Sequence, residues 1–232
     1  MSYEGIRTEA LFLLAENRFQ DSKSFYEEHK VLIKAQAVDP LRRLVAELAP
    51  AMHRIDPLLV TDPLTNGCVS RVRRDNRFTH DKSMYRENLW IAFMRDKRTW
   101  PSAPAFYLDF SLRGAEWGVG FYRATPAVMQ CLRRRTDADP AGMQRALKKA
   151  QKAGFILGGQ PYARPRSLPD TPALLRPLYD CRSIELSRTE PPDFVADAGL
   201  PRRLKDGFEA LAPVYRLLME AVEDACGYRE GE

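Results

Sequence analysis

The spacing of apolar residues changes period twice along this chain, and that change restricts the fold more than any other feature of the sequence. In residues 41–52 apolar side chains recur every three or four positions, as on one face of an α-helix. In residues 105–112 apolar and polar side chains alternate, as along a β-strand that buries one face. Helical spacing returns in residues 204–222. The order of helices, strands and helices predicts an α+β fold.

Individual elements are predicted from apolar spacing and from the residues that start or stop them. Asp21, Thr125 and Asp139 suit helix N-caps, because their side-chain oxygens accept from the free backbone N–H groups of a first turn. Gly154 suits a helix end, and Pro213 predicts a kink or break in the C-terminal helix. Short segments rich in β-branched and aromatic residues predict strands at 68–75, 88–96, 103–114 and 116–125, and one more within 154–166.

We therefore expect a single α+β unit over residues 1–232, helical in 1–60, sheet-rich in 65–125, and helical or mixed in 126–232. Its central sheet, mostly antiparallel and built from about residues 67–123, would be packed by the N-terminal and C-terminal helices. Gly118 and Gly120 form a lone Gly-x-Gly inside a predicted strand. Because the third glycine of a dinucleotide site is missing, they indicate a bulge or a close backbone contact.

Composition excludes several classes of protein. The chain has 232 residues, 44% of them hydrophobic, which is enough for a real core. No apolar run approaches the roughly 18 residues that a membrane span needs. The four cysteines and three histidines are scattered, without the spacing of metal ligands or of a CxxC pair. We expect a cytoplasmic protein with reduced, mostly buried thiols, no metal, no cofactor and no membrane contact.

Charge is distributed unevenly along the chain. Residues 71–98 hold nine Lys/Arg against four Asp/Glu, and residues 133–152 hold seven against two, so each segment has a net charge of +5. Residues 170–232 hold eight against thirteen, a net charge of −5. If the two basic segments share a face, that face attracts anions; if they meet the acidic segment, the charges pair internally.

Residues 71–86, RVRRDNRFTHDKSMYR, mix arginines, aspartates and aromatic residues more densely than any other stretch. One interpretation is an anion site, because guanidinium groups present paired, planar donors to phosphate or carboxylate. The ligand-binding residues would be Arg71, Arg73, Arg74, Arg77, Lys82 and Arg86. Asp75 and Asp81 would hold the arginines before the ligand arrives, and the candidate catalytic groups are Asp81, Tyr85 and His80.

The same segment also fits a structural interpretation. Asp75 and Asp81 would then pair with Arg74, Arg77 or Lys82 to fix a turn between two strands. Clustered opposite charges occur in such structural networks as well as in binding sites, and Phe78 is expected in the core.

The segment resembles the signature of a known family, the bacterial and fungal proteins grouped as domain of unknown function 2461. That signature is R-x-x-R-D-x-R-F-S-x-D-K-x-P-Y-K, and it is matched here by Arg71, Arg74, Asp75, Arg77, Phe78, Thr79, Asp81, Lys82, Tyr85 and Arg86. Met84 stands where the family has proline. The segments WGVGFYRATP and LGGQPYARPR also resemble the family. The resemblance implies one α+β unit and brings no activity.

Two functions from different classes remain open. The first is an enzyme or binding protein for a phosphorylated or carboxylated small molecule at the arginine-rich segment. The alternative is a nucleic-acid or protein interaction module that uses the basic middle region, with Trp90, Trp100, Trp117 and Tyr107 as stacking partners. No Ser/His/Asp or Cys/His arrangement is recognisable, so the sequence assigns neither a reaction nor an oligomeric state.

Overall fold

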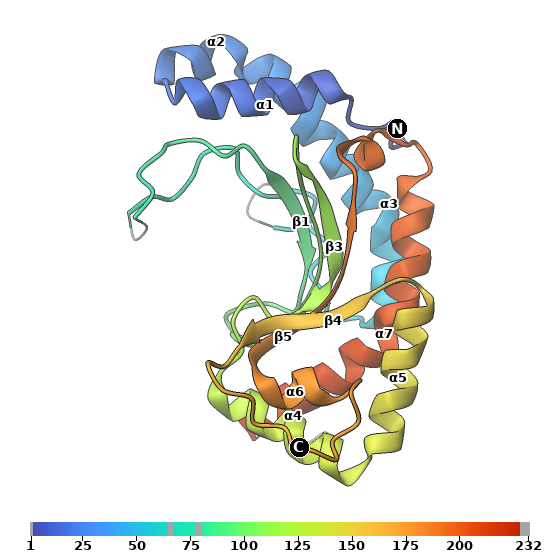
Figure 1. The fold of residues 1–232 in the computed structure, drawn as a ribbon. Helices are drawn as coiled ribbons and strands as arrows, with labels where there is room; N and C mark the ends of the chain where they lie inside the picture. The colour runs from blue at the N-terminus through green and yellow to red at the C-terminus, as the bar shows by residue number, and fades with distance from the viewer. Residues whose placement is uncertain (1, 65–66, 78–79, 228–232) are drawn as a thin grey trace. The chain divides into compact units, whose positions relative to one another are not determined.

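The computed structural model describes residues 2–64, 67–77 and 80–227. In these residues, helices come before and after a segment that forms most of the sheet (Figure 1). The predicted α+β class is confirmed. The N-terminal helices are α1 (Thr8–Gln20), α2 (Lys23–Ile33) and α3 (Asp39–Ile55), with a π-helical segment, Lys34–Val38, between α2 and α3. The later helices are α4 (Pro126–Ala138), α5 (Pro140–Lys152), α6 (Arg176–Asp180) and α7 (Leu200–Cys226), with a 3₁₀ turn at Pro192–Ala196.

The sheet has five strands in the order β1-β2-β3-β5-β4. They are β1 (Leu89–Phe93), β2 (Ala105–Ser111), β3 (Gly114–Gly120), β4 (Ile156–Pro161) and β5 (Cys181–Glu190). β4 and β5 are antiparallel, with Gly158 opposite Glu185. The predicted extent of the sheet, residues 67–123, is wrong, because β4 and β5 lie outside it and β5 was not predicted at all. The predicted strand at 68–75 is also wrong: that segment forms only isolated bridges, Val69 with Ile91 and Arg73 with Tyr85.

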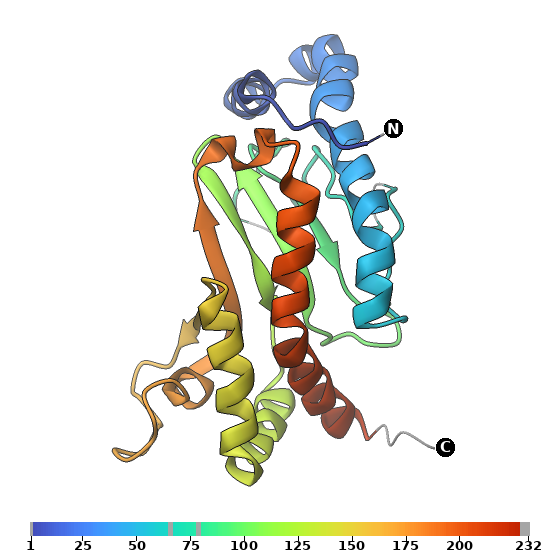
Figure 2. The same cartoon turned by 90° about the vertical axis from the view of Figure 1, so that its right-hand side faces the viewer.

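The predicted helix ends are mostly confirmed. Thr125 accepts from the N–H of Val128, Asp139 accepts from the N–H of Gly142, and Gly154 has a φ of 87°. The prediction for Asp21 is wrong: Ser22 is the N-cap of α2, and Asp21 instead ends α1 with a φ of 43°. α7 continues through Pro213 without a break. Figure 2 shows this helix bending partway along its length, as expected for the other predicted outcome, a kink.

Gly118 confirms the prediction of a close backbone contact. A Cβ atom built on Gly118 would lie 1.9 Å from the backbone oxygen of Leu186, and one on Gly120 would lie 2.5 Å from the Cβ of Glu185. These distances are far shorter than a van der Waals contact, so β3 and β5 approach each other where β3 has no side chain.

The chain divides into two compact units. Unit 1 comprises Met1–Phe93, Tyr107–Trp117 and Thr189–Lys205, and unit 2 comprises Met94–Phe106, Gly118–Arg188 and Asp206–Glu232. In unit 1, α3 packs its apolar face against β1 (Figure 2). The ring of Trp117 stacks on that of Phe194 in the same unit. In unit 2, the ring of Phe106 lies 4.8 Å from that of Tyr215 and 5.2 Å from that of Phe208, measured between centroids.

We expect both units to unfold in one cooperative transition, as the predicted single α+β unit requires. The boundaries between them fall inside β2, β3, β5 and α7, so no loop separates the units. Melting one unit would break strands and a helix that continue into the other. Differential scanning calorimetry checks this: one peak is expected, with equal calorimetric and van't Hoff enthalpies. Two resolved peaks would contradict the single unit.

The cysteines are free thiols, and Cys68, Cys131 and Cys181 are buried while Cys226 is exposed. Burial raises the pKa of the Cys68 thiol to about 12. The Cys68 thiol is therefore a poor nucleophile, in keeping with the expected structural role. Among the residues that the structure describes, no helix has the length and apolar character to cross a membrane.

Candidate functional site

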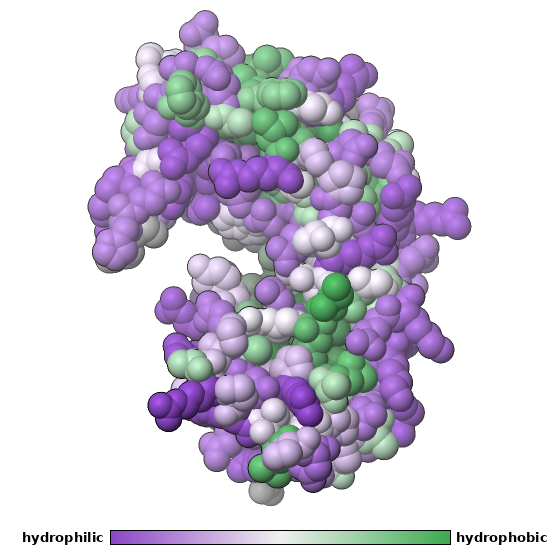
Figure 3. All heavy atoms as spheres, viewed as in Figure 1, coloured by the Kyte–Doolittle hydropathy of each residue, from purple (hydrophilic) through white to green (hydrophobic). Residues whose placement is uncertain are grey.

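The arginine-rich segment forms an irregular hairpin of unit 1, here called the arm (residues 68–77 and 80–88). The N–H of Arg74 donates to the oxygen of Met84 (2.8 Å), and the N–H of Arg86 donates to that of Val72 (2.9 Å). Figure 1 shows the arm extending away from β1, and Figure 3 shows hydrophilic residues covering it. Phe78 and Thr79 lie outside the described residues, so the expected core position of Phe78 is not addressed.

Asp81 is the centre of an ionic network on the arm. Its carboxylate accepts from Arg74 Nη1 and from Arg18 Nη2 of α1, the latter at 3.2 Å. Its Oδ1 atom also accepts from the hydroxyl (2.7 Å) and the N–H (3.0 Å) of Ser83. These bonds from Ser83, together with Arg74, lower the pKa of Asp81 to about 2. Two guanidinium groups from different elements therefore meet at one carboxylate that is ionised at neutral pH, and the side chain of Asp81 remains 46% exposed.

A second pair lies nearer the end of the arm. Arg77 donates from Nε (2.9 Å) and Nη2 (2.7 Å) to the two carboxylate oxygens of Asp75. These bonds lower the pKa of Asp75 to about 2. Lys82 Nζ donates to the backbone oxygen of Asn76 (3.2 Å), and the Asn76 amide donates back to the oxygen of Lys82 (2.7 Å). Both aspartates thus hold arginines, an arrangement common to the binding and the structural interpretations.

Asp21 fastens the arm to the N-terminal helices. Its Oδ1 atom accepts from the N–H groups of Met84 (2.7 Å) and Tyr85 (3.2 Å). Tyr85 is buried, and its ring stacks on Tyr26 of α2 at 4.7 Å between centroids. Burial raises the pKa of the Tyr85 hydroxyl. Tyr85 is therefore packed against α2, while the Arg74–Asp81 network lies on the exposed part of the arm.

A polar cluster on the sheet adjoins the base of the arm; we call Asn88, Tyr107, Asp109 and Glu116 the sheet-face cluster. The Asn88 amide donates to Asp109 Oδ2 (2.7 Å), and the Tyr107 hydroxyl donates to Glu116 Oε1 (3.2 Å). Burial raises the pKa of Asp109 to about 6, with a further increase from the charge of Glu116. Arg86 partly offsets this increase, and its guanidinium lies 4.4 Å from the ring centroid of Trp90.

The structure brings some of the predicted site residues together and separates others. Arg74 and Asp81 meet directly, and Arg77 and Asp75 form a pair of their own. Arg86 lies instead beside Trp90. Exposed positions are held by Arg71, Arg73, His80 and Lys82. Of the proposed stacking residues, Trp117 is buried, so a nucleic-acid base cannot reach its ring.

Sequence reasoning missed the partners that come from other elements. Arg18 and Asp21 are about sixty residues away from the groups they contact, and no local pattern marks them. Asp109 is one of the polar residues in the alternating segment 105–112. Its contact with Asn88 depends on the pairing of β1 with β2, which the sequence does not show.

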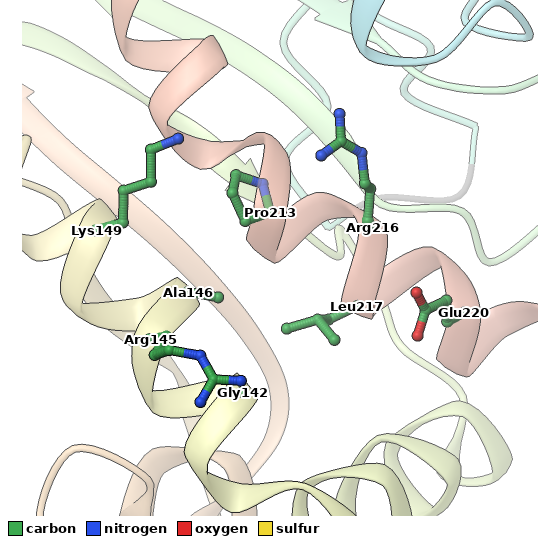
Figure 4. A pocket seen from close by; sticks show the side chains of 8 residues that line it. All are labelled: Gly142, Arg145, Ala146, Lys149, Pro213, Arg216, Leu217 and Glu220. Carbon is green, nitrogen blue, oxygen red and sulfur yellow. The ribbon is translucent and has the colours of Figure 1, made fainter.

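A separate groove of about 420 Å³ lies between α5 and α7 in unit 2 (Figure 4). Its lining residues are Gly142, Arg145, Ala146, Lys149, Pro213, Arg216, Leu217 and Glu220. Leu217 points toward Ala146, whereas Arg216 points away from α5. The charged side chains therefore do not gather at one point. Within the described ranges, no group of three or more His, Cys, Asp or Glu residues could hold a metal ion.

Comparison with known proteins places the arm within a family. A family model described as conserved hypothetical protein, domain of unknown function 2461, matches residues 9–216. The chain belongs to this family. The residues that match the model of domain of unknown function 2461 include the arm, the whole sheet and most of α7. No curated protein and no solved structure matches the chain.

Proposed function

We propose that the protein binds a small phosphorylated or carboxylated molecule at the arm, with Arg74 and Arg18 as its principal ligands. The observation that carries the proposal is the meeting of these two guanidinium groups at the carboxylate of Asp81. Each guanidinium has more donors than one shared carboxylate can accept from, so donors remain for an incoming anion.

Preorganisation supports the proposal. Arg74 is only 20% exposed in its side chain, and its Nη1 atom also donates to the Ser83 hydroxyl (3.2 Å). A side chain held in this way loses little conformational entropy when a ligand binds. The exposed side chains of Arg73 and Lys82 add positive charge to the same arm and would attract anions toward it.

A nucleic-acid interaction has less support. A stacking platform needs exposed aromatic rings along a basic surface. Trp117 is buried, and the rings of Trp90 and Trp100 each have an arginine over them, Arg86 and Arg95 respectively. A compact, anchored arginine pair suits a single small anion better than an extended strand.

The test is a thermal melt of the wild type and of Arg74→Ala, each with and without phosphate. Phosphate should raise the wild-type melting temperature by mass action, and it should raise that of Arg74→Ala by less. Arg74→Lys should recover only part of the effect, because lysine keeps the charge but lacks the planar fork. Melts in sodium chloride of equal ionic strength separate specific binding from screening.

Arg98→Ala is the matched control. Arg98 pairs with Asp96 two positions away, as Arg77 pairs with Asp75, but it lies outside the arm. Its loss should leave the phosphate effect intact. If Arg74→Ala melts well below the wild type while phosphate never raises the wild-type melting temperature, the arm is a structural network and the proposal is wrong.

A further inference from the structure

Three arginines in unit 2 surround one tyrosine ring. The guanidinium carbons of Arg166, Arg182 and Arg133 lie 3.5, 5.5 and 5.8 Å from the ring centroid of Tyr162. They come from three different elements: Arg133 from α4, Arg182 from β5, and Arg166 from the loop after β4. Attraction between each cation and the face of the ring supports this gathering, but the three cations repel one another.

Arg133 is fixed in place before any ligand arrives. Its Nε atom donates to the backbone oxygen of Leu178 (3.1 Å), and its Nη2 atom donates to that of Cys181 (2.9 Å). The same Nη2 atom lies 3.5 Å from the Tyr162 hydroxyl. The backbone N–H of Tyr162 donates to the backbone oxygen of Asp180 (2.7 Å). The Arg133 guanidinium and the backbone of Tyr162 are thus both held by hydrogen bonds within the chain.

The carboxylates near the cluster are bonded to other groups. In the part of the chain that the structure describes, Arg133, Arg166 and Arg182 form no ion pair. Asp180 lies beside the cluster, but its carboxylate accepts from the N–H groups of Arg166 (2.7 Å) and Ser167 (2.8 Å) and from the Ser167 hydroxyl (3.0 Å). Other arginines of this unit do pair, as Arg135 does with Glu220 and Asp224. Among the described residues, therefore, the guanidinium groups of the cluster have no carboxylate bound directly to them.

We infer that Arg133, Arg166 and Arg182 bind a phosphate dianion beside the Tyr162 hydroxyl, either as inorganic phosphate or as a phosphate monoester. A dianion matches three guanidinium groups gathered around one ring better than a single carboxylate does, because the forks of Arg166 and Arg182 can each donate to two of its oxygens. Arg133 keeps the donors of its Nη1 atom for the same ligand, since its Nε and Nη2 atoms donate to backbone oxygens. Arg166 and Arg182 are exposed, so an anion can reach them from solvent. These residues are different from those of the arm, so a failure of the proposal for the arm would not contradict this site.

Isothermal titration calorimetry with inorganic phosphate and with glycerol 3-phosphate tests the inference. Every chain compared carries Arg74→Ala, so that the arm does not contribute to the measured binding. Adding Arg166→Ala and Arg182→Ala together to that chain should weaken phosphate binding at least tenfold. Arg164→Ala is the matched control, since Arg164 is an exposed arginine of the same loop that lies over no ring, and it should leave binding unchanged. Tighter binding of glycerol 3-phosphate than of phosphate would identify a monoester as the ligand.

Three results would overturn the inference. Phosphate binding of equal strength in the Arg166→Ala, Arg182→Ala variant and in Arg164→Ala would show that the cluster does not bind it. So would a wild-type chain that binds neither phosphate compound at millimolar concentration. Binding of a short thymidine oligonucleotide without binding of either dianion would assign the cluster to phosphodiesters instead. Circular dichroism of each variant confirms that it is folded.

Discussion

Replacing Gly118 by alanine should destabilise the protein by more than about 3 kcal/mol, because the new methyl group has no space. Its Cβ would lie 1.9 Å from the backbone oxygen of Leu186 and 2.9 Å from the Cα of Ser187. Both are backbone atoms of β5, so relief requires β3 and β5 to move apart and lose hydrogen bonds. The free energy of unfolding from urea titration measures the effect.

Gly158→Ala is the control for this substitution. Gly158 is also a strand glycine, but a Cβ there would meet nothing within 4 Å. Alanine costs less backbone entropy than glycine on folding, so this variant should be slightly more stable, by about 0.5–1 kcal/mol. Equal losses of stability in both variants would show that the close approach of β3 to β5 does not limit position 118.

The free energy of unfolding should fall as the pH is raised from about 4 to about 6, because of Asp109. Burial raises the pKa of this carboxyl group from 3.8 to about 6 in the folded protein. Between these values the folded chain holds a proton that the unfolded chain releases, so raising the pH favours unfolding. The loss is complete above about pH 6, and for this half-buried group we expect about 1–3 kcal/mol.

Asp109→Asn isolates that contribution. The amide oxygen can still accept from Asn88, and the side chain carries no charge to desolvate. The variant should match the wild type at pH 4 and exceed its stability by about 1–3 kcal/mol at pH 7. Urea titrations across this range give both curves. Asp170→Asn, a substitution at an exposed position, should have the same free energy of unfolding as the wild type at every pH in this range. A variant that is never more stable than the wild type would mean that Asp109 is ionised without cost.

Much of the fold was predictable because local signals mark its elements. Thr125 and Asp139 precede prolines and cap their helices, and the alternation in residues 105–112 identifies β2. β5 was missed because its buried and exposed residues do not alternate regularly along the strand. The glycines at 118 and 120 did indicate a close neighbour, but the sequence could not show which segment it was.

The site was predictable only in part for a related reason. The pairing of Arg77 with Asp75 is local, so composition alone suggested it. The pairing of Asp81 with Arg18 and the hold of Asp21 on Met84 depend on how the helices pack against the arm. These partners lie 63 positions apart in the chain, and only the folded structure places them together.

The strand order has a consequence for synthesis of the protein on the ribosome. β5 lies between β3 and β4, yet it begins sixty residues after β3 ends. At ~5–20 residues per second, translation leaves the edge of β3 without its partner for several seconds. An unpaired edge exposes backbone donors and acceptors that can pair with another chain. A nascent chain that stalls before residue 181 would therefore be prone to aggregate, and its productive folding depends on how quickly β5 arrives.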